Sequence, residues 1–356
     1  MDGVRKISVV IPVYQAEKYI GATIANLKRQ TIDNFEAILV DNGSTDNSLA
    51  VARHAMGDDE RFQLLNESVK GPSAARNKGI TVARGEWILF LDADDTFADN
   101  MLETMLRAAA NRDGCDNRAG DDGVVMVVSG YQSWQNGHML YASPMVSEEY
   151  DPKGMAKRLF QVEHYQGFIW NKLLRKSVID RYRLRFQEDI FYNEDRLFVL
   201  EFLLKCYEAD KENSLLHSDL HSVIRMITAQ PYYYQLHEIS AMSSARKGGM
   251  VADREATEIV AFERMLSEIE EILGKDNEVY SSAKKDMIYS ELRMFRKMVG
   301  RRRSFQYRNH MLRRFARKAE AQDVFFLEGK DKILWNVFIR YGRTGSVYTR
   351  NPDFFR

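Results

Sequence analysis

Short apolar segments in the first hundred residues end abruptly in polar groups. They span residues 8–14, 37–44 and 87–95. Apolar runs this short, bounded by turn residues, predict buried strands. Between the first two, Ile20, Ile24 and Leu27 recur at the spacing of one helix face. Strands that alternate with helices predict βαβ units, right-handed crossovers and a mainly parallel sheet.

The strand and helix pattern continues to about residue 240 and then changes. Further strands are predicted near residues 62–65, 123–131 and 232–235, and further helices near 99–110, 152–161 and 194–207. Residues 113–122, rich in Gly, Asp and Asn, predict a loop. From about Lys247 the chain shows long helical patterns without proline until Pro352. We therefore predict an α/β domain over residues 1–246 and an α-helical C-terminal extension over 247–356.

Composition narrows the class of protein. The 356 residues carry a formal net charge of zero, with 45% hydrophobic and 29% charged residues, which is typical of a globular protein and gives no overall bias toward nucleic acid. Cys115 and Cys206 lie far apart and indicate neither a disulfide framework nor a structural zinc site. No apolar run approaches the roughly 18 residues of a membrane span. These features predict a cytoplasmic protein.

Three carboxylates, Asp92, Asp94 and Asp95, follow the last of the apolar segments. In an open parallel sheet, ligands bind beyond the carboxyl ends of the strands, so the strand ends should converge on one site. Carboxylates this close repel each other unless a cation neutralises them, and Mg²⁺ and Mn²⁺ prefer carboxylate oxygen. We therefore predict a divalent metal site of the kind that a diphosphate leaving group requires.

Six short motifs occur in the order and at the spacings of a known family. They are PVY at 12–14, VDNGSTD at 40–46, GPSAARN at 71–77, FLDADD at 90–95, WNKL at 170–173 and NED at 193–195. Together they resemble the family-two inverting glycosyltransferases with the GT-A fold, particularly the bacterial enzymes that build capsular, exopolysaccharide or wall polymers. The resemblance covers roughly residues 6–240 and implies a mixed, mainly parallel sheet flanked by helices.

A UDP-sugar donor, as the resemblance implies, needs a surface for its base. Pro12, Val13 and Tyr14 are predicted to supply that apolar surface. Asp41 would accept a hydrogen bond from the uracil N3–H, as the matching family residue does. The alternative for Asp41 is a turn residue that bonds the backbone of residues 42–43.

Basic side chains are the candidates for the donor diphosphate. Arg76 falls in the first turns of the helix that begins after Gly71, where backbone amides and a guanidinium can both face phosphate oxygens. The alternative for Arg76 is a solvated surface residue. Family members often carry an asparagine shortly before the glycine that matches Gly71, and this chain has Lys70 there. We predict Lys70 to be a charge partner for phosphate. Lys172 is predicted to approach the donor phosphates as well.

The family's DxD motif assigns roles to the carboxylates. Its first Asp meets the ribose and its second binds the metal, which implies Asp92 for the ribose and Asp94 for Mn²⁺ or Mg²⁺. His237 is a further candidate metal ligand, because the family sometimes places a His after its last sheet strand. A lone His is otherwise a surface or packing residue. Asp95 has an alternative role as the N-cap or first-turn acid of helix 99–110.

Transfer also needs a general base that removes the acceptor hydroxyl proton. Asp195 is the predicted base, because it begins an apolar-periodic helix that would anchor its backbone. The alternative for Asp195 is helix capping and stabilisation of the helix dipole. Glu194 is predicted to orient acceptor hydroxyls or share the base role. Trp170 is predicted to be an apolar platform for the acceptor sugar, with core packing as its alternative.

The resemblance thus predicts a metal-dependent, inverting hexosyl- or N-acetylhexosaminyltransferase. It would move a sugar from a UDP-sugar to a hydroxyl of a glycan or lipid-linked acceptor in cell-surface polysaccharide synthesis. Two other classes stay open. A sugar nucleotidyltransferase also uses Asp-bound metal, but the first strand is not followed by a Gly-rich triphosphate loop. A non-catalytic scaffold with a degenerate transferase domain is disfavoured by intact Asp92, Asp94 and Asp195.

The C-terminal extension is locally basic. Residues 284–318 contain thirteen Lys or Arg and two Asp or Glu, a local excess of eleven positive charges. This charge predicts attraction to the anionic inner face of the membrane or to an acidic acceptor. An apolar stripe would enter the lipid interface, and it comprises Ile333, Leu334, Val337, Phe338 and Tyr341. Packing against protein is the alternative, and nucleic acid is a weaker prediction than either.

Overall fold

A computed structural model describes residues 6–110, 123–161, 167–215, 221–237, 251–299 and 314–344. The chain forms two compact units. Unit 1 comprises Met1–Asp189 with Glu194–Ser243, and unit 2 comprises Ile190–Asn193 with Ser244–Arg356. The division into domains at residues 246 and 247 stays a prediction. The predicted 113–122 loop lies outside the described residues.

Unit 1 is built on an eight-stranded sheet with the order β3-β2-β1-β4-β10-β6-β11-β9. The strands are β1 (Ile7–Val13), β2 (Phe35–Asp41), β3 (Phe62–Asn66), β4 (Trp87–Phe90), β6 (Val124–Val128), β9 (Glu148–Tyr150), β10 (Lys172–Arg175) and β11 (Val223–Met226). The four strands β3, β2, β1 and β4 run parallel, while β10 is antiparallel to both of its neighbours. The predicted mixed, mainly parallel sheet is confirmed.

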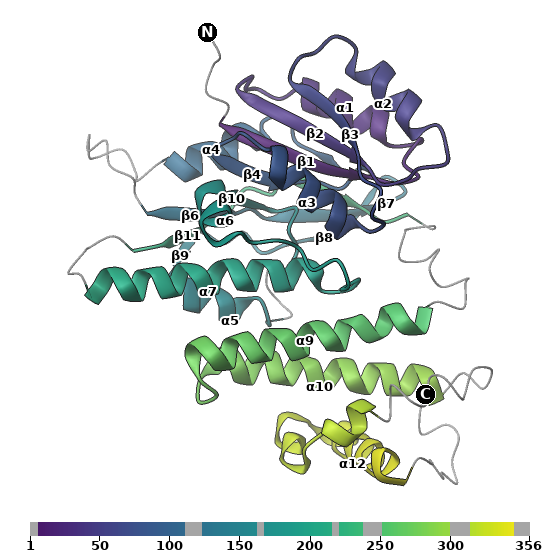
Figure 1. The fold of residues 1–356 in the computed structure, drawn as a ribbon, viewed down its shortest axis with the longest axis vertical. Helices are drawn as coiled ribbons and strands as arrows, with labels where there is room; N and C mark the ends of the chain where they lie inside the picture. The colour runs from purple at the N-terminus through teal and green to yellow at the C-terminus, as the bar shows by residue number, and fades with distance from the viewer. Residues whose placement is uncertain are drawn as a thin grey trace. The chain divides into compact units, whose positions relative to one another are not determined.

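Helices flank this sheet (Figure 1). They are α1 (Ile20–Lys28), α2 (Ser48–Met56), α3 (Pro72–Val82), α4 (Met101–Ala110), α5 (Pro152–Arg158), α6 (Lys176–Tyr182) and α7 (Glu194–Leu215). The β1 residues alternate between two faces, and Val9 and Ile11 share a core cluster with Ile24 of α1. On the other face, Gly79 of α3 packs so close to Val10 that a Cβ there would lie 2.3 Å from the valine Cγ1. Helix α3 therefore lies directly against β1, which fixes the position of its first turn.

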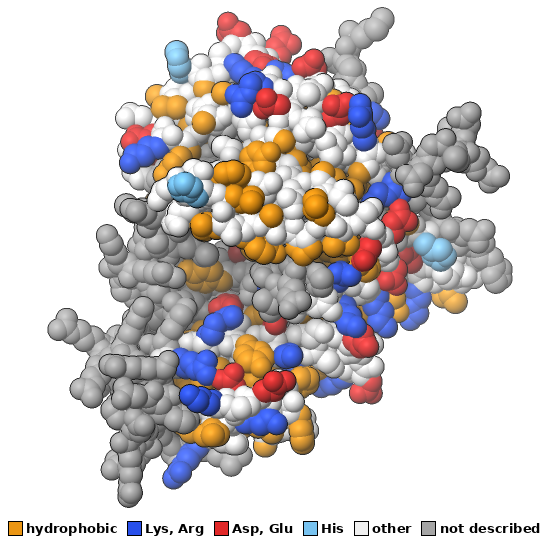
Figure 2. Space-filling model, turned by 180° about the vertical axis from the view of Figure 1, so that it is seen from behind, with side chains coloured by type: hydrophobic (Ala, Val, Ile, Leu, Met, Phe, Trp, Pro, Cys, Tyr) orange, Lys and Arg blue, Asp and Glu red, His pale blue; other side chains and the backbone are white. Residues whose placement is uncertain are grey.

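A second sheet of unit 1 has four strands in the order β5-β12-β7-β8. They are β5 (Thr96–Phe97), β12 (Tyr232–Gln235), β7 (Tyr131–Gln135) and β8 (His138–Ala142). The single strand predicted over 123–131 is two strands, because β6 ends at Val128 and the chain then enters β7 of the other sheet. Strand β7 continues into an antiparallel hairpin with β8. All residues of the edge strand β8 are exposed. Figure 2 shows that one face of the molecule carries many hydrophobic side chains.

Unit 2 is helical in its described part. It contains α9 (Val251–Leu273), α10 (Glu278–Val299), the 3₁₀ helix η2 (Ala321–Phe326) and α12 (Gly329–Thr344). Phe295 of α10 packs on Phe338 of α12, with ring centroids 5.3 Å apart. Lys284 forms an ion pair of 3.3 Å with Asp323 of η2.

The apolar stripe of α12 is largely occupied by packing inside unit 2. Leu334 and Phe338 are buried, while Ile333 is 55% exposed. The prediction that this stripe enters lipid is therefore wrong for Leu334 and Phe338, because both already face the protein. Tyr341 has a side chain outside the described residues. In the part of the chain that the structure describes, no helix is both long and apolar enough to span a bilayer.

Candidate active site

The DxD carboxylates stand where the register of the sheet places them. Phe90 at the end of β4 lies beside Val10 of β1, and the Leu91 N–H donates to the Val10 carbonyl at 3.0 Å. The next residues therefore emerge beyond the carboxyl ends of the parallel strands. The Asp92 side chain is 31% exposed and the Asp94 side chain is 40% exposed. Both are accessible to a ligand from solvent.

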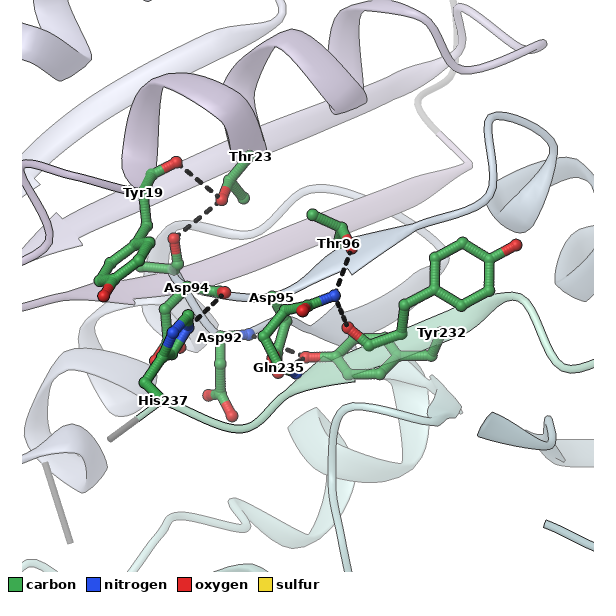
Figure 3. Close-up of polar contacts among 11 residues, drawn as sticks. Tyr19, Thr23, Asp92, Asp94, Asp95, Thr96, Tyr232, Gln235 and His237 are labelled. Carbon is green, nitrogen blue, oxygen red and sulfur yellow. Dashed lines mark hydrogen bonds and ion pairs between the residues drawn. The ribbon is translucent and has the colours of Figure 1, made fainter. Parts of the chain in front are cut away.

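Asp95 has a structural role at the same turn (Figure 3). Its carboxylate accepts from the Tyr232 hydroxyl at 2.5 Å and from the Gln235 N–H at 2.7 Å. Burial, then the charges of Asp92 and Asp94, raise the pKa of Asp95 well above its usual range. The alternative of Asp95 as the N-cap or first-turn acid of the helix is wrong, because α4 begins only at Met101. Asp95 instead joins the DxD turn to β12, which carries His237 just beyond its end.

His237 and Asp94 form the candidate metal pair. The imidazole Nε2 lies 3.8 Å from the Asp94 carboxylate, and the ring packs on Tyr19 with centroids 4.4 Å apart (Figure 3). Burial and the Asp92 charge raise the pKa of Asp94 to about 6, and His237 acts in the opposite sense. Such a pairing of carboxylate and imidazole is chemically suited to a divalent ion.

The donor set of this pair is incomplete by itself. Among the described residues, no group of three or more His, Cys, Asp and Glu side chains is placed to hold a metal ion. Mg²⁺ and similar ions in nucleotide sites take only one or two carboxylates from protein, and phosphates and water complete the shell. Asp94 with His237 therefore fits an ion that is bound together with a diphosphate.

Arg76 joins the two halves of the site. Its guanidinium lies 2.8 Å from Asp195, 3.1 Å from Glu194 and 3.5 Å from Asp92. Burial alone would lower the pKa of Arg76, but the three carboxylates outweigh that effect and raise it. The alternative of a solvated surface arginine is wrong, because Arg76 is only 5% exposed. A contact with phosphate would have to share a guanidinium that already holds three acids.

The two acids of the NED motif lie in the first turn of α7, where the side chains of Glu194 and Asp195 are 13% and 19% exposed. Burial raises the pKa of Glu194, and the neighbouring charge of Asp195 raises it further. Burial likewise raises the pKa of Asp195, while Arg76 acts against the shift. Asp195 can also interact favourably with the helix dipole. Its alternative role in stabilising α7 is therefore compatible with its place near Asp92 in the site. A buried carboxylate with a raised pKa is a suitable proton acceptor.

Replacement of Arg76 tests how strongly the site depends on this ion pair. We expect Arg76→Met to lower the free energy of unfolding by about 3 kcal/mol at pH 8, because two buried carboxylates lose their cation. The loss should be smaller at pH 5. The pKa of Glu194 is raised from 4.5 to about 8 in the folded state. Between these two pH values the folded protein binds more protons than the unfolded protein, so stability falls as the pH rises from 4.5 to about 8.

Urea unfolding at pH 5, 6.5 and 8 measures this effect. Arg29→Met is the matched control, because Arg29 pairs with Asp99 at 3.2 Å on the surface. Its loss should cost less than about 1 kcal/mol at every pH. Equal destabilisation by Arg76→Met at all three pH values would contradict the buried-pair account.

The predicted base-binding residues lie together at the ends of β1 and β2. Val13 pairs with Asp41 in the parallel register, and Val13 is buried while Pro12 is half-buried. Tyr14 is 60% exposed and accessible to a ligand. The Asp41 carboxylate accepts from the Gly43 N–H at 3.2 Å and the Ser44 N–H at 3.3 Å. The turn-forming alternative for Asp41 is therefore present in the structure.

Asn42 is a site residue that sequence reasoning missed. Its side-chain amide donates to the Val69 carbonyl at 2.6 Å and accepts from the Gly71 N–H at 2.6 Å. It thereby connects the end of β2 to the loop that carries Lys70, which is exposed. An Asn directly after Asp41 in a turn was the available signal, because its amide can bond two backbone strands at once.

The WNKL motif lies inside unit 1. Trp170 is 3% exposed and its ring stacks on Tyr232 with centroids 4.3 Å apart. This is the core-packing alternative, and the indole is not accessible as an acceptor platform. Lys172 is fully buried, and its ammonium donates to the Asn171 side chain at 2.9 Å and to the Phe168 carbonyl. The ammonium of Lys172 is therefore engaged with protein groups, and its predicted approach to the donor phosphates stays a prediction.

The fold and the arrangement of acids define a class. A mainly parallel sheet that ends in a DxD turn, with flanking helices, is the GT-A architecture. Residues 8–182 match the family described as glycosyl transferase family 2, and the chain contains a domain of that family.

Relatives and solved structures agree with this assignment. The chain is 35% identical over 199 residues to EpsH of Bacillus subtilis (strain 168), a protein described as a glycosyltransferase, and the match covers 54% of each. It is 26% identical over 300 residues to the uncharacterized glycosyltransferase YibD of Escherichia coli (strain K12), covering 82% of this chain and 76% of that one. The chain thus spans about half of the first relative's length.

A similar fold occurs in TarS of S. aureus, which was crystallised as residues 1–349 in complex with UDP-GlcNAc. The TM-score is 0.65 at 18% sequence identity, covering 97% of this chain and 93% of that one. At this identity the likeness is one of fold.

Proposed function

We propose that this protein is an inverting glycosyltransferase that moves a hexosyl or N-acetylhexosaminyl group from a UDP-sugar to a hydroxyl of a glycan or lipid-linked acceptor. Its place would be in cell-surface polysaccharide synthesis. The observation that carries the proposal is the Arg76 guanidinium, which holds Asp92 of the donor side within 3.5 Å and Asp195 of the acceptor side within 2.8 Å. Donor and general base would therefore meet in one site.

Each residue has a role that follows from its placement. The exposed Tyr14 and half-buried Pro12 would cover one face of the base, and Asp41 would meet its edge. Asp92 would bind the ribose. Lys70, exposed on the loop that Asn42 anchors, would approach the diphosphate as a flexible charge.

The chemical step is a single displacement at the anomeric carbon. Asp195 accepts the proton of the acceptor hydroxyl while that oxygen attacks from the face opposite the nucleotide, and UDP leaves. Glu194, bound to the same guanidinium, would orient acceptor hydroxyls. The geometry is that of an inverting glycosidase with an acceptor hydroxyl in place of water.

Asp94 and His237 would hold Mn²⁺ or Mg²⁺. An ion held there would supply positive charge that neutralises the departing diphosphate. The Asp94 carboxylate supplies a hard oxygen ligand to it, and the ring packing on Tyr19 would keep the His237 imidazole oriented.

The choice of a UDP-sugar has support from a neighbour in fold. TarS was crystallised with UDP and with UDP-GlcNAc, and the Asp41 position at the end of β2 suits a partner for the uracil N3–H. UDP-GlcNAc is therefore the first donor to test, followed by UDP-glucose and UDP-galactose.

UDP release from these three donors, with Mn²⁺ and with EDTA, tests the proposed function. We expect at least one donor to give UDP with Mn²⁺ and none with EDTA. Release of pyrophosphate from UTP and a sugar 1-phosphate would indicate a nucleotidyltransferase instead. Failure to bind or consume any nucleotide would indicate a non-catalytic scaffold.

The basic segment 284–318 leads to a separate prediction about the membrane. Full-length protein should float with vesicles that contain anionic phospholipid. Each basic residue that comes close to the surface should contribute about 1 kcal/mol to the binding free energy. The binding should fade between 0.1 and 0.5 M salt as charges are screened. Charge reversal by Arg301→Glu, Arg302→Glu and Arg303→Glu together should weaken it.

A matched triple variant controls for the change of net charge. Lys18→Glu, Arg53→Glu and Lys153→Glu make the same change at exposed positions of unit 1. Vesicle binding that is equal in the two triple variants, or that does not respond to salt, would contradict attraction through residues 284–318.

A further inference from the structure

One peptide group connects Lys172 to the proposed general base. The Lys172 ammonium donates to the carbonyl of Phe168, and the backbone N–H of Ile169 faces Asp195, where it acts to lower the pKa of that carboxylate. That carbonyl and that N–H belong to the same peptide bond. A hydrogen bond accepted at the carbonyl polarises the amide and strengthens its N–H as a donor. Lys172 therefore acts on Asp195 through a shared amide.

The surrounding residues fix this peptide group in place. Gly167 lies so close to the first turn of α7 that a Cβ on it would be 2.2 Å from the Cβ of Arg196. Only glycine permits that approach, which brings the next peptide to Asp195. Lys172 is itself held by Asn171, whose amide donates to the Ser129 carbonyl at 3.0 Å. The segment is thus tied to α7 on one side and to the end of β6 on the other.

The charges around the base explain why such support is needed. Asp195 faces Arg76 of α3, Asp92 beyond β4, Glu194 of its own helix and Lys172 of β10, and Arg196 also faces Lys172. Burial and the charge of Asp92 oppose ionisation of Asp195. A donor aimed at the carboxylate favours its charged form, which is the form that accepts a proton.

We propose that Lys172 is a positioning residue for the general base, because it holds and polarises the Phe168–Ile169 peptide group that binds Asp195. This inference rests on the proposed function, since it gives Asp195 the role of base. It replaces the predicted contact between Lys172 and donor phosphates. The WNKL motif thereby serves the acceptor side of the reaction.

Lys172→Met tests the proposal, because methionine keeps the length of the side chain and removes the donor. With UDP-GlcNAc and Mn²⁺, we expect the kcat for UDP release to fall about tenfold while the KM for the donor changes little. The acid limb of the pH–rate profile should move up by about one pH unit, because the carboxylate loses support for its charged form. Lys153→Met, at an exposed position, should leave kcat and the profile unchanged.

A spectroscopic measurement keeps the proposal testable without transfer activity. In protein labelled with ¹⁵N-isoleucine, with the Ile169 signal assigned through Ile169→Leu, the amide of Ile169 should shift with pH as Asp195 titrates. Its shift should be smaller in Lys172→Met, and the Asp195 step should disappear in Asp195→Asn. Should Lys172→Met fail to fold, the wild-type signal still decides, because deprotonation of the buried lysine should produce a second step.

Two results would overturn the inference. One is a folded Lys172→Met with wild-type kcat and an unmoved acid limb. The other is an Ile169 amide that does not respond to pH in the wild-type protein. Absence of UDP release from every donor by wild-type protein would instead contradict the proposed function, while the Ile169 signal would still report on the hydrogen-bonded path.

Discussion

Asp195→Asn should abolish most sugar transfer and leave donor binding intact. The amide cannot accept the acceptor proton, so we expect kcat to fall by about 10²-fold or more, the usual scale for removal of a general base. The affinity for UDP with Mn²⁺ should stay within about twofold, because Asp195 lies on the acceptor side of Arg76. Initial rates with the active donor and titration calorimetry with UDP measure the two quantities.

The competing account of Asp195 is structural, and the same variant separates the two. Should Asp195 serve mainly to stabilise the start of α7, Asp195→Asn would lower the melting temperature sharply and reduce binding and transfer together. Asp180→Asn is a suitable control, because Asp180 pairs with Lys176 at 2.6 Å on the exposed surface of α6. It should change neither the rate nor the melting temperature by much.

Asp94→Asn should remove the dependence of donor binding on metal. The substitution replaces the charged ligand of the candidate pair with a neutral amide, so a divalent ion loses most of its attraction to the site. We expect UDP to bind Asp94→Asn equally weakly with Mn²⁺ and with EDTA. Calorimetry of UDP binding under both conditions checks this result.

A change at a remote carboxylate provides the control for Asp94→Asn. Asp33→Asn also removes one negative charge, at a side chain that is 93% exposed and pairs only with Arg61 among the described contacts. It should preserve the gain in UDP affinity that Mn²⁺ produces. An unchanged metal effect in Asp94→Asn would contradict the assignment of Asp94 as a ligand.

Local sequence patterns were sufficient to predict the parallel strands of the main sheet. The apolar segments that became β1, β2 and β4 are buried on both faces, so their composition alone predicted strands and their polar ends predicted a common site. The convergence of Asp92 with Asp195 followed from the family resemblance. The sequence predicted one strand over residues 123–131, whereas the structure has β6 and β7 in two different sheets. An apolar run does not show where the chain leaves one sheet for another.

Long-range contacts account for the parts that could not be predicted. Arg76 and Asp195 lie 119 positions apart in the chain, so no local pattern could reveal that this arginine binds acids of α7. Asp95 resembles a helix cap in sequence, yet Tyr232, 137 positions away, determines its partner. The sequence around Trp170 suits either core packing or a platform for a sugar. Only the stacking of its ring on Tyr232 distinguishes the two roles.

The stereochemistry of the released sugar tests the central claim most directly. Water can replace the acceptor when the enzyme turns over a UDP-α-sugar alone, and Asp195 would direct it to the face opposite the nucleotide. ¹H NMR during turnover of UDP-GlcNAc, or of the donor that proves active, should show the β anomer of the free sugar first, before mutarotation. Initial appearance of the α anomer would contradict the single-displacement account, and so would the same product ratio in Asp195→Asn at an undiminished rate.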